Sequence, residues 1–223
     1  MLESEIKEMV RTIALEARLC QWATGIGKIS PPVLEAMAQV PRHQFVPPDL
    51  RAYAYGNGPL PIGAGQTISQ PYIVALMTDL LRPEEDDVIL EVGCGSGYQA
   101  AILSLLVEQV HSLEIVPSLA SEASERLAEM GFSNVEVRQG DGYQGLVEHA
   151  PFAGIIVTAA ARHVPPPLLA QLKPGGRLVI PVGLPHGAQE LLLFVKEEDG
   201  TVTSKKILDV AFVPLTGPDS GFS

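Results

Sequence analysis

The strongest constraint on the fold is a glycine-rich run, E-V-G-C-G-S-G-Y, at residues 91–98. It follows an apolar stretch at residues 88–92, which predicts a buried strand, and leads into a segment that predicts a helix over residues 98–107. A strand that turns through glycines into a helix brings backbone N–H groups and a helix N-terminus to one point, where a ligand can approach closely. The sequence therefore predicts a ligand-binding turn in an α/β domain.

The alternation of strand and helix patterns continues along the chain. Further strands are predicted over residues 110–115, 135–138, 154–158, 177–181, 189–196 and 203–212, and further helices over residues 119–130 and 165–172. The last two strands flank Glu198-Asp-Gly200, which is a hairpin signal. Strands that alternate with helices indicate a doubly wound, mostly parallel sheet covered on both faces, to which the hairpin adds antiparallel strands.

The first part of the chain has a different character. Residues 1–20 have the spacing of an amphipathic helix, residues 32–40 predict a second short helix, and residues 42–61 are rich in proline and glycine and predict loops. A polar loop over residues 63–71 then leads into a helix over residues 72–81. We therefore expect one domain. Its parts are a helical cap over residues 1–87, an α/β core over residues 88–217 and a frayed tail over residues 218–223.

Composition narrows the classes of partner. The chain has 15 Lys and Arg against 26 Asp and Glu, a formal net charge of -11, which argues against a nucleic-acid surface and against docking on anionic lipid. The apolar run at residues 100–107 is far shorter than the roughly 20 residues of a membrane span, and the charged first helix does not resemble a secretory signal. Two cysteines, Cys20 and Cys94, make neither a disulfide framework nor a thiolate zinc site, which favours a cytoplasmic protein.

The glycine run differs from three better-known glycine motifs. A dinucleotide fingerprint needs glycine where Tyr98 stands, and no Gly-Lys-Ser/Thr follows as in a P-loop. A nucleophile elbow needs glycine in place of Cys94 and Tyr98. An acidic residue before G-x-G-x-G at a strand tip instead resembles the cofactor loop of S-adenosylmethionine (SAM) methyltransferases. The alternative is an ordinary strand–helix turn.

Two acidic residues stand where the neighbouring strands end. Glu114 ends the second predicted strand, where such sheets place a carboxylate for a ribose diol, and a carboxylate can accept both hydroxyl hydrogen bonds. Asp141, within Gly140-Asp141-Gly142, ends the third strand and could accept the exocyclic amine of adenine. The alternatives are a solvated acid at Glu114 and a purely conformational turn at Asp141.

The polar loop Gln66-Thr-Ile-Ser-Gln-Pro-Tyr72 is the second candidate site. This loop carries the hydroxyl side chains of Thr67 and Ser69, and it leads into a helix whose early proline suits the first turn. Ser69 could contact a substrate, or it could act only as a helix N-cap; the two roles are compatible.

Seven segments, in this order along the chain, resemble the protein-L-isoaspartate O-methyltransferase family. They are PRHQFV at residues 41–46, LPIG at 60–63, GQTISQP at 65–71, GCGSGY at 93–98, GDG at 140–142, IIVTA at 155–159 and FVPLT at 212–216. The resemblance covers nearly the whole chain, from about Pro41 to Thr216, while the first forty residues and the tail match weakly. The Q-T-I-S segment is the one that distinguishes this family, since many methyltransferases share the glycine loop. Two positions depart slightly from the family pattern. Cys94 stands where the family usually has threonine, and Glu91 is one of the two acidic residue types found at its position.

The resemblance implies a seven-stranded SAM-methyltransferase (Rossmann-like) sheet, whose last strands vary in order within the family, and a cap that carries half of the substrate site. It implies methyl transfer from SAM, released as S-adenosyl-L-homocysteine, to the α-carboxylate of L-isoaspartyl and D-aspartyl residues in damaged proteins. Ser69 is then the catalytic-site residue. The implied substrate-binding residues are Gln66, Thr67, Ile68, Gln70, Pro71, Val213, Leu215 and Thr216, and the implied cofactor-binding residues are Glu91, Gly93, Gly95, Gly97, Glu114, Asp141 and Gly142.

The chemistry of such a reaction requires few side chains. A carboxylate with a pKa near about 4 is already an ionised nucleophile, and the sulfonium already activates the methyl group, so neither base nor metal is needed. Accordingly we interpret the histidines, which lack ligand spacing, as structural or solvated: His43, His111, His149, His163 and His186. We expect a monomer. The alternatives are a SAM-dependent carboxyl methyltransferase for a small-molecule acid and a SAM-binding scaffold or sensor.

Overall fold

The computed structural model describes residues 2–185 and 187–218, so the predicted tail lies outside the description except for Pro218. The helices are α1 (Leu2–Leu19), α2 (Gln21–Thr24), α3 (Pro31–Gln39), α4 (Pro71–Leu81), α5 (Tyr98–Ser104), α6 (Pro117–Glu129) and α7 (Pro166–Ala170), with 3-10 turns η1 (Arg42–Phe45), η2 (Pro48–Tyr53) and η3 (Val147–His149). The strands are β1 (Leu60–Gly63), β2 (Gln66–Ile68), β3 (Val88–Val92), β4 (Gln109–Glu114), β5 (Val135–Gln139), β6 (Phe152–Val157), β7 (Leu172–Gly183), β8 (Gln189–Lys196) and β9 (Val202–Val210).

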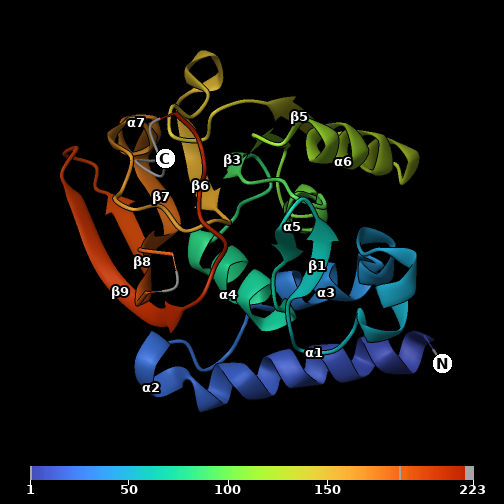
Figure 1. The fold of residues 1–223 in the computed structure, drawn as a ribbon. Coiled ribbons are helices and arrows are strands. Elements are labelled where there is room, and N and C mark those ends of the chain that lie inside the picture. Colours follow the sequence, from blue (N-terminus) through green and yellow to red (C-terminus); the bar gives the residue numbers. More distant parts are fainter. Residues whose placement is uncertain (1, 186, 219–223) are drawn as a thin grey trace.

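Seven strands form one sheet in the order β5-β4-β3-β6-β7-β8-β9 (Figure 1). The first five strands in this order, β5-β4-β3-β6-β7, are parallel to one another, and β8 is antiparallel to both β7 and β9. The predicted seven-stranded, mostly parallel sheet is confirmed. Its last three strands lie in chain order because two hairpins join them. The predicted hairpin between β8 and β9 is present, whereas the hairpin between β7 and β8 was not predicted.

Helices and hydrophobic residues cover both faces of the sheet. Ile89 of β3 packs in the cluster that also holds α4, α5 and Leu127 of α6, whereas Leu90 and Val92 pack in the cluster that holds Leu168 of α7. Outside this layer, α1 crosses α3 and α4 (Figure 1). Among the described residues, no helix combines the length and the apolar character that crossing a bilayer requires.

The segment between α3 and α4 differs from the predicted loop. It contains η1, η2 and a small antiparallel sheet, in which Leu60 pairs with Ile68 and Pro61 with Thr67. The sheet brings the polar loop that contains Ser69 over the carboxyl ends of β3 and β4. The side chain of Ile62, on β1, lies close to Gly95 of the glycine loop, since a Cβ atom on Gly95 would be 3.2 Å from Ile62 Cδ1.

The chain beyond β9 returns to the end of the sheet that carries the carboxyl ends of the parallel strands. Ala160 N–H, just after β6, donates a hydrogen bond to Val213 O at 2.8 Å, and Leu215 N–H donates to Ala160 O at 2.8 Å. The C-terminal segment thus reaches the carboxyl end of β6. The strands that follow β3 in the chain, β4 and β6, lie on opposite sides of it, so the strand order reverses at β3. The carboxyl ends of strands at such a reversal are where α/β sheets bind ligands.

Candidate active site

A cavity of about 520 Å³, which includes space open to solvent, lies at the carboxyl ends of these strands. Four of the predicted cofactor-binding residues line it: Gly93, Gly95, Glu114 and Gly142. Five of the predicted substrate-binding residues line it as well: Gln66, Thr67, Val213, Leu215 and Thr216. Residues from the cap, the glycine loop and the C-terminal segment therefore meet in one cavity.

The glycine loop forms one wall through its backbone. Gly93 has a φ of 95°, in the left-handed region that favours glycine, and its N–H donates to Leu113 O at 2.8 Å. A Cβ atom on Gly93 would lie 2.6 Å from Thr158 Oγ1, so a side chain there would displace its neighbours. The loop thus exposes backbone at a place where any larger residue would intrude.

Glu114 joins the glycine loop to the end of β4. Its side chain is buried, and its Oε2 accepts a hydrogen bond from Gly95 N–H at 2.8 Å while Oε1 accepts one from Val116 N–H at 2.9 Å. A carboxylate has about four acceptor positions, so two remain for hydroxyl groups of a ligand in the cavity. A ribose diol has the donors that such a carboxylate would accept.

Three predicted cofactor-binding residues do not line the cavity. Glu91 is 0% exposed and accepts a hydrogen bond from Ser112 Oγ. Gly97 faces α6, where a Cβ atom would be 3.1 Å from Leu127 Cδ1. Asp141 Oδ1 accepts from Tyr143 N–H at 3.0 Å. These residues lie behind or beside the wall and shape the turns that form it.

The burial of Glu91 makes stability depend on pH. Burial is the main cause that raises its pKa to about 8, and the charge of Glu114 adds to the rise while the Ser112 hydroxyl opposes it. Between pH 4.5 and about 8 the folded chain therefore keeps a proton that the unfolded chain has lost, and stability falls as pH rises through this window.

Glu91→Gln, which cannot ionise, should remove this slope. We expect the variant to be more stable than wild type at pH 8 and similar at pH 5, with slopes that differ by at most about 1.4 kcal/mol per pH unit. Urea unfolding at both pH values measures the difference. Parallel stability curves for the two proteins would show that Glu91 is ionised in the folded state.

Ser69 is half-buried and lies between β2 and α4. The N-cap of α4 is Gln70, and no side chain makes a capping hydrogen bond there. The interpretation of Ser69 as a helix N-cap is therefore wrong. Its backbone carbonyl accepts a hydrogen bond from Arg42 Nη2 at 2.7 Å.

Two further cavities meet at Ser69. One, of about 320 Å³, lies between the Ser69 loop and the glycine loop, and Ile68 also lines it. The other, of about 1170 Å³, is an outer groove that Gln70, Tyr72 and the segment after β9 line, together with Glu16 of α1. Thr67 lines both of these cavities and the 520 Å³ cavity. Pro71 lines none of the three and begins α4.

Sequence reasoning missed several residues of this site. Thr158, just after β6, lines two of the cavities and donates a hydrogen bond to Gly93 O. The signal was available, because Thr158 belongs to the I-I-V-T-A segment and ends a predicted strand. The backbone and apolar positions of the wall carried no such signal: Leu113, Ile115, Val116 and Ala159.

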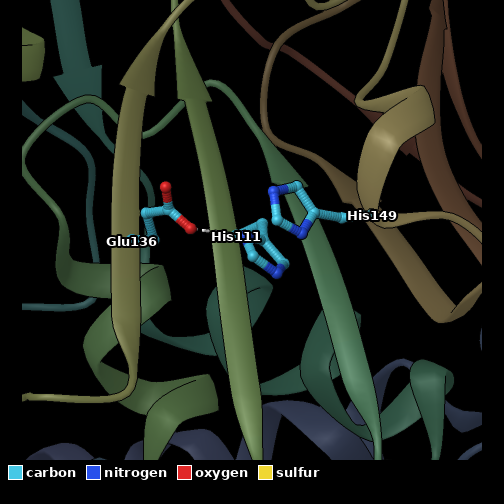
Figure 2. A group of neighbouring side chains, drawn as sticks. All are labelled: His111, Glu136 and His149. Carbon is cyan, nitrogen blue, oxygen red and sulfur yellow. Dashed lines mark ion pairs between the residues drawn. The ribbon is translucent and has the colours of Figure 1, made fainter.

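Two of the histidines that we interpret as structural or solvated lie together in the fold, although no spacing in the sequence indicates it. His111 of β4 and His149 of η3 stack with ring centroids 4.0 Å apart, and His111 Nδ1 lies 3.1 Å from Glu136 Oε2 (Figure 2). Of the others, His43 contacts the Tyr55 hydroxyl at 2.8 Å, and His186 lies outside the described residues.

His111, Glu136 and His149 each offer a ligand atom within 4.8 Å of the other two. The stacked rings, however, are 28° from parallel, so their in-plane lone pairs run side by side instead of converging on one ion. Glu136 also pairs with Arg138, Oε1 to Nε, at 2.7 Å. Burial and the nearby His149 lower the pKa of His111, which therefore packs as a neutral ring. We assign the cluster a packing role.

Comparisons with known proteins agree on one family. Residues 20–220 match the model of the family described as protein-L-isoaspartate(D-aspartate) O-methyltransferase. Protein-L-isoaspartate O-methyltransferase 2 of Syntrophobacter fumaroxidans is 60% identical over 94% of this chain and 85% of its own length. The Polaromonas sp. protein of the same name is 54% identical over 94% of this chain and 99% of its own.

Solved structures agree with the sequence relatives. One of a protein-L-isoaspartate O-methyltransferase superposes with a TM-score of 0.83 at 26% identity, over 97% of this chain and 67% of its own. A Plasmodium falciparum protein described by the same activity, solved with S-adenosyl-L-homocysteine, shares the fold with a TM-score of 0.76 at 23% identity, over 96% of this chain and 98% of its own.

Proposed function

This chain belongs to the protein-L-isoaspartate(D-aspartate) O-methyltransferase family, and on that premise we propose a role for each part of the site around Ser69. The chain is a SAM-dependent methyltransferase that methylates the α-carboxylate of isoaspartyl residues in proteins. The observation that carries the assignment of roles is that Thr67 lines both the outer groove and the 520 Å³ cavity, while Ser69 beside it lines the outer groove and the 320 Å³ cavity next to the glycine loop.

The 520 Å³ cavity holds the cofactor. Gly93, Gly95 and Gly142 line this cavity and would hold the cofactor through backbone, and Glu114 would accept hydrogen bonds from its ribose hydroxyls. The wall fits SAM because Gly93 leaves no room for a side chain against Thr158, which also lines the cavity, and because Glu114 has acceptor positions left. When bound, SAM supplies a methyl group already activated by a sulfonium. Glu91, Gly97 and Asp141 support the loop from outside the cavity.

The isoaspartyl segment enters along the outer groove. Its extra backbone carbon lets the α-carboxylate reach past Ser69 and Thr67, where the Ser69 hydroxyl donates a hydrogen bond and fixes the carboxylate in line with the methyl group. Gln66, Ile68 and Gln70 shape the approach, and Val213, Leu215 and Thr216 close the opposite wall, while Pro71 starts the helix that follows. Orientation and exclusion of water account for the rate, since the carboxylate needs no base.

The remaining assignments are coarser. We regard residues 1–87 as a cap that carries half of the substrate site and residues 88–217 as the cofactor-binding core. With two free cysteines and a net charge of -11, we propose a cytoplasmic monomer that acts on isoaspartyl proteins and peptides and binds neither nucleic acid nor membrane.

Paired peptides test the function. With methyl-labelled SAM, an isoaspartyl peptide should be esterified while the aspartyl peptide of the same sequence should not be. Mild base should release the label as methanol, because the product is an ester. Equal labelling of both peptides, or a base-stable label, would contradict the assignment, and labelling of small carboxylic acids alone would favour a small-molecule methyltransferase.

Ser69→Ala tests the role of the hydroxyl. We expect the rate to fall roughly 10- to 100-fold, because one orienting hydrogen bond is lost, while SAM binding and the melting temperature stay near wild type. Steady-state kinetics, calorimetry and a melting curve on the one variant measure all three quantities.

Ser121→Ala, an exposed serine on α6, is the matched control and should leave the rate unchanged. Wild-type turnover in Ser69→Ala would remove Ser69 from the site. A methylated Ser69 trapped in the wild-type enzyme would instead overturn direct transfer to the carboxylate.

A further inference from the structure

A fully buried cation lies behind Ser69. The side chain of Arg42, on η1, is 0% exposed, and no carboxylate of the described residues lies within ion-pair distance of it. Burial lowers the pKa of Arg42 from its usual range. A buried charge without a counter-ion is costly, so its neighbours must stabilise it through other contacts.

Those contacts join three separate segments. Arg42 Nε donates to Ala54 O at 2.8 Å, after η2, and Nη2 donates to Ser69 O at 2.7 Å. The guanidinium carbon lies 4.8 Å from the ring centroid of Tyr98, the residue that follows the glycine loop and begins α5. One planar group therefore contacts the cap, the Ser69 loop and the start of the helix after the glycine loop.

The partners of Arg42 are fixed in their turn. The Tyr98 ring packs edge-on against Phe45 with ring centroids 5.4 Å apart, and it is 1% exposed. Ser69, by contrast, is in a loop only half-buried, between a three-residue strand and a helix whose N-cap makes no side-chain hydrogen bond. The bond from Nη2 therefore connects the less constrained Ser69 loop to a rigid frame.

We propose that Arg42 is a positioning residue, which holds the Ser69 loop at a set distance from the glycine loop through the Ser69 carbonyl. The inference rests on the proposed role of Ser69. Arg42 does not touch the substrate and acts through the backbone, so that the Ser69 hydroxyl meets the carboxylate in line with the methyl group. A lysine cannot replace it, because an ammonium group lacks the planar fork that reaches Ala54 O and Ser69 O together.

Arg42→Lys is the decisive variant, because it keeps the charge and loses the fork. We expect kcat on the isoaspartyl peptide to fall about 10- to 100-fold, while SAM affinity, measured by calorimetry, changes less than about 3-fold. Amide hydrogen exchange of residues 66–70 should become faster in the variant and stay unchanged in β3. That exchange measurement does not depend on which acceptor is methylated.

A double-mutant cycle separates positioning from a general effect on folding. If Arg42 acts through Ser69, Arg42→Lys should cost less than about 3-fold in kcat when Ser69 is already alanine, because the group that it orients is gone. Multiplicative losses would overturn the inference, as would wild-type kcat in the single variant. Arg177→Lys is the control, since the half-buried Arg177 donates to Leu80 O at the other end of the sheet and its loss should leave kcat unchanged.

The outcomes distinguish this inference from the proposed function. If wild type ignores isoaspartyl peptides but Arg42→Lys still loosens residues 66–70, the function is wrong and the tie between Arg42 and the loop holds. If wild type methylates the peptide and the loop stays protected in the variant, the inference alone is wrong. Arg42→Met, similar in length but without donors, is the second variant; if neither variant folds, Arg42 determines the fold and the positioning role is overturned.

Discussion

Gly93→Ala should lower the affinity for SAM by roughly 100- to 1,000-fold. Alanine at a φ of 95° carries backbone strain of about 1–3 kcal/mol, and its Cβ atom would lie 2.6 Å from Thr158 Oγ1, a clash worth about 1–3 kcal/mol more. The free protein can relieve both by moving the loop, so binding must restore the strained conformation. A combined cost of about 3–4 kcal/mol corresponds to the predicted loss of affinity.

Gly200→Ala is the matched control for Gly93→Ala. Gly200 also has a left-handed φ, 83°, but a Cβ atom there would meet nothing within 4 Å, and the β8–β9 turn lies away from the cavity. This variant should lose some stability and no affinity. Adding Thr158→Ala to Gly93→Ala should recover part of the affinity, because the clash is removed and the strain remains. Wild-type affinity in Gly93→Ala would mean that the loop does not contact the cofactor.

Glu114→Ala should lower the affinity for SAM about 10- to 150-fold. The lost interaction is a hydrogen bond to a charged group, worth about 1.5–3 kcal/mol, and the amides of Gly95 and Val116 also lose their acceptor. Calorimetry measures the affinity, and the KM for the isoaspartyl peptide should change much less.

The control for Glu114→Ala is Glu129→Ala. Glu129 is an exposed carboxylate near the end of α6, so its removal changes the net charge by the same amount without touching the cavity. SAM affinity in this control should stay at the wild-type value. If Glu114→Ala binds SAM as tightly as the control does, Glu114 has no part in holding the cofactor.

The core of the fold was predictable because its strands and helices are locally distinct. Residues 88–92 are buried on both faces and end in glycines, which together specify a strand, a turn and a helix, and the prediction matches β3 and α5 at their first residues. The small sheet of β1 and β2 was not predictable. Its strands have four and three residues, carry a proline and a glycine, and show no alternation long enough to separate a strand from a loop.

The candidate site was predictable where a residue type is itself the signal. Glycines in the loop and Glu114 at a strand end could be named from sequence. That Glu91 does not line the cavity could not be foreseen, because a strand buried on both faces does not reveal which face meets the ligand. Successive side chains of a strand point to opposite faces, so Glu91 shares the face of Ile89, toward α4 and α5. The His111–His149 stack joins residues far apart in the chain, and no local pattern indicates it.

The return of the C-terminal segment to β6 has a consequence for how the enzyme is made. Val213, Leu215 and Thr216 line the 520 Å³ cavity that we propose for the cofactor, and the first two of them are hydrogen-bonded to Ala160. A ribosome that has synthesised β3 to β9 has therefore still not completed the cavity wall. Ligand binding stabilises a protein only once its site exists. A nascent chain, or one terminated before Val213, must therefore fold without help from the cofactor, and only the finished chain gains that stabilisation.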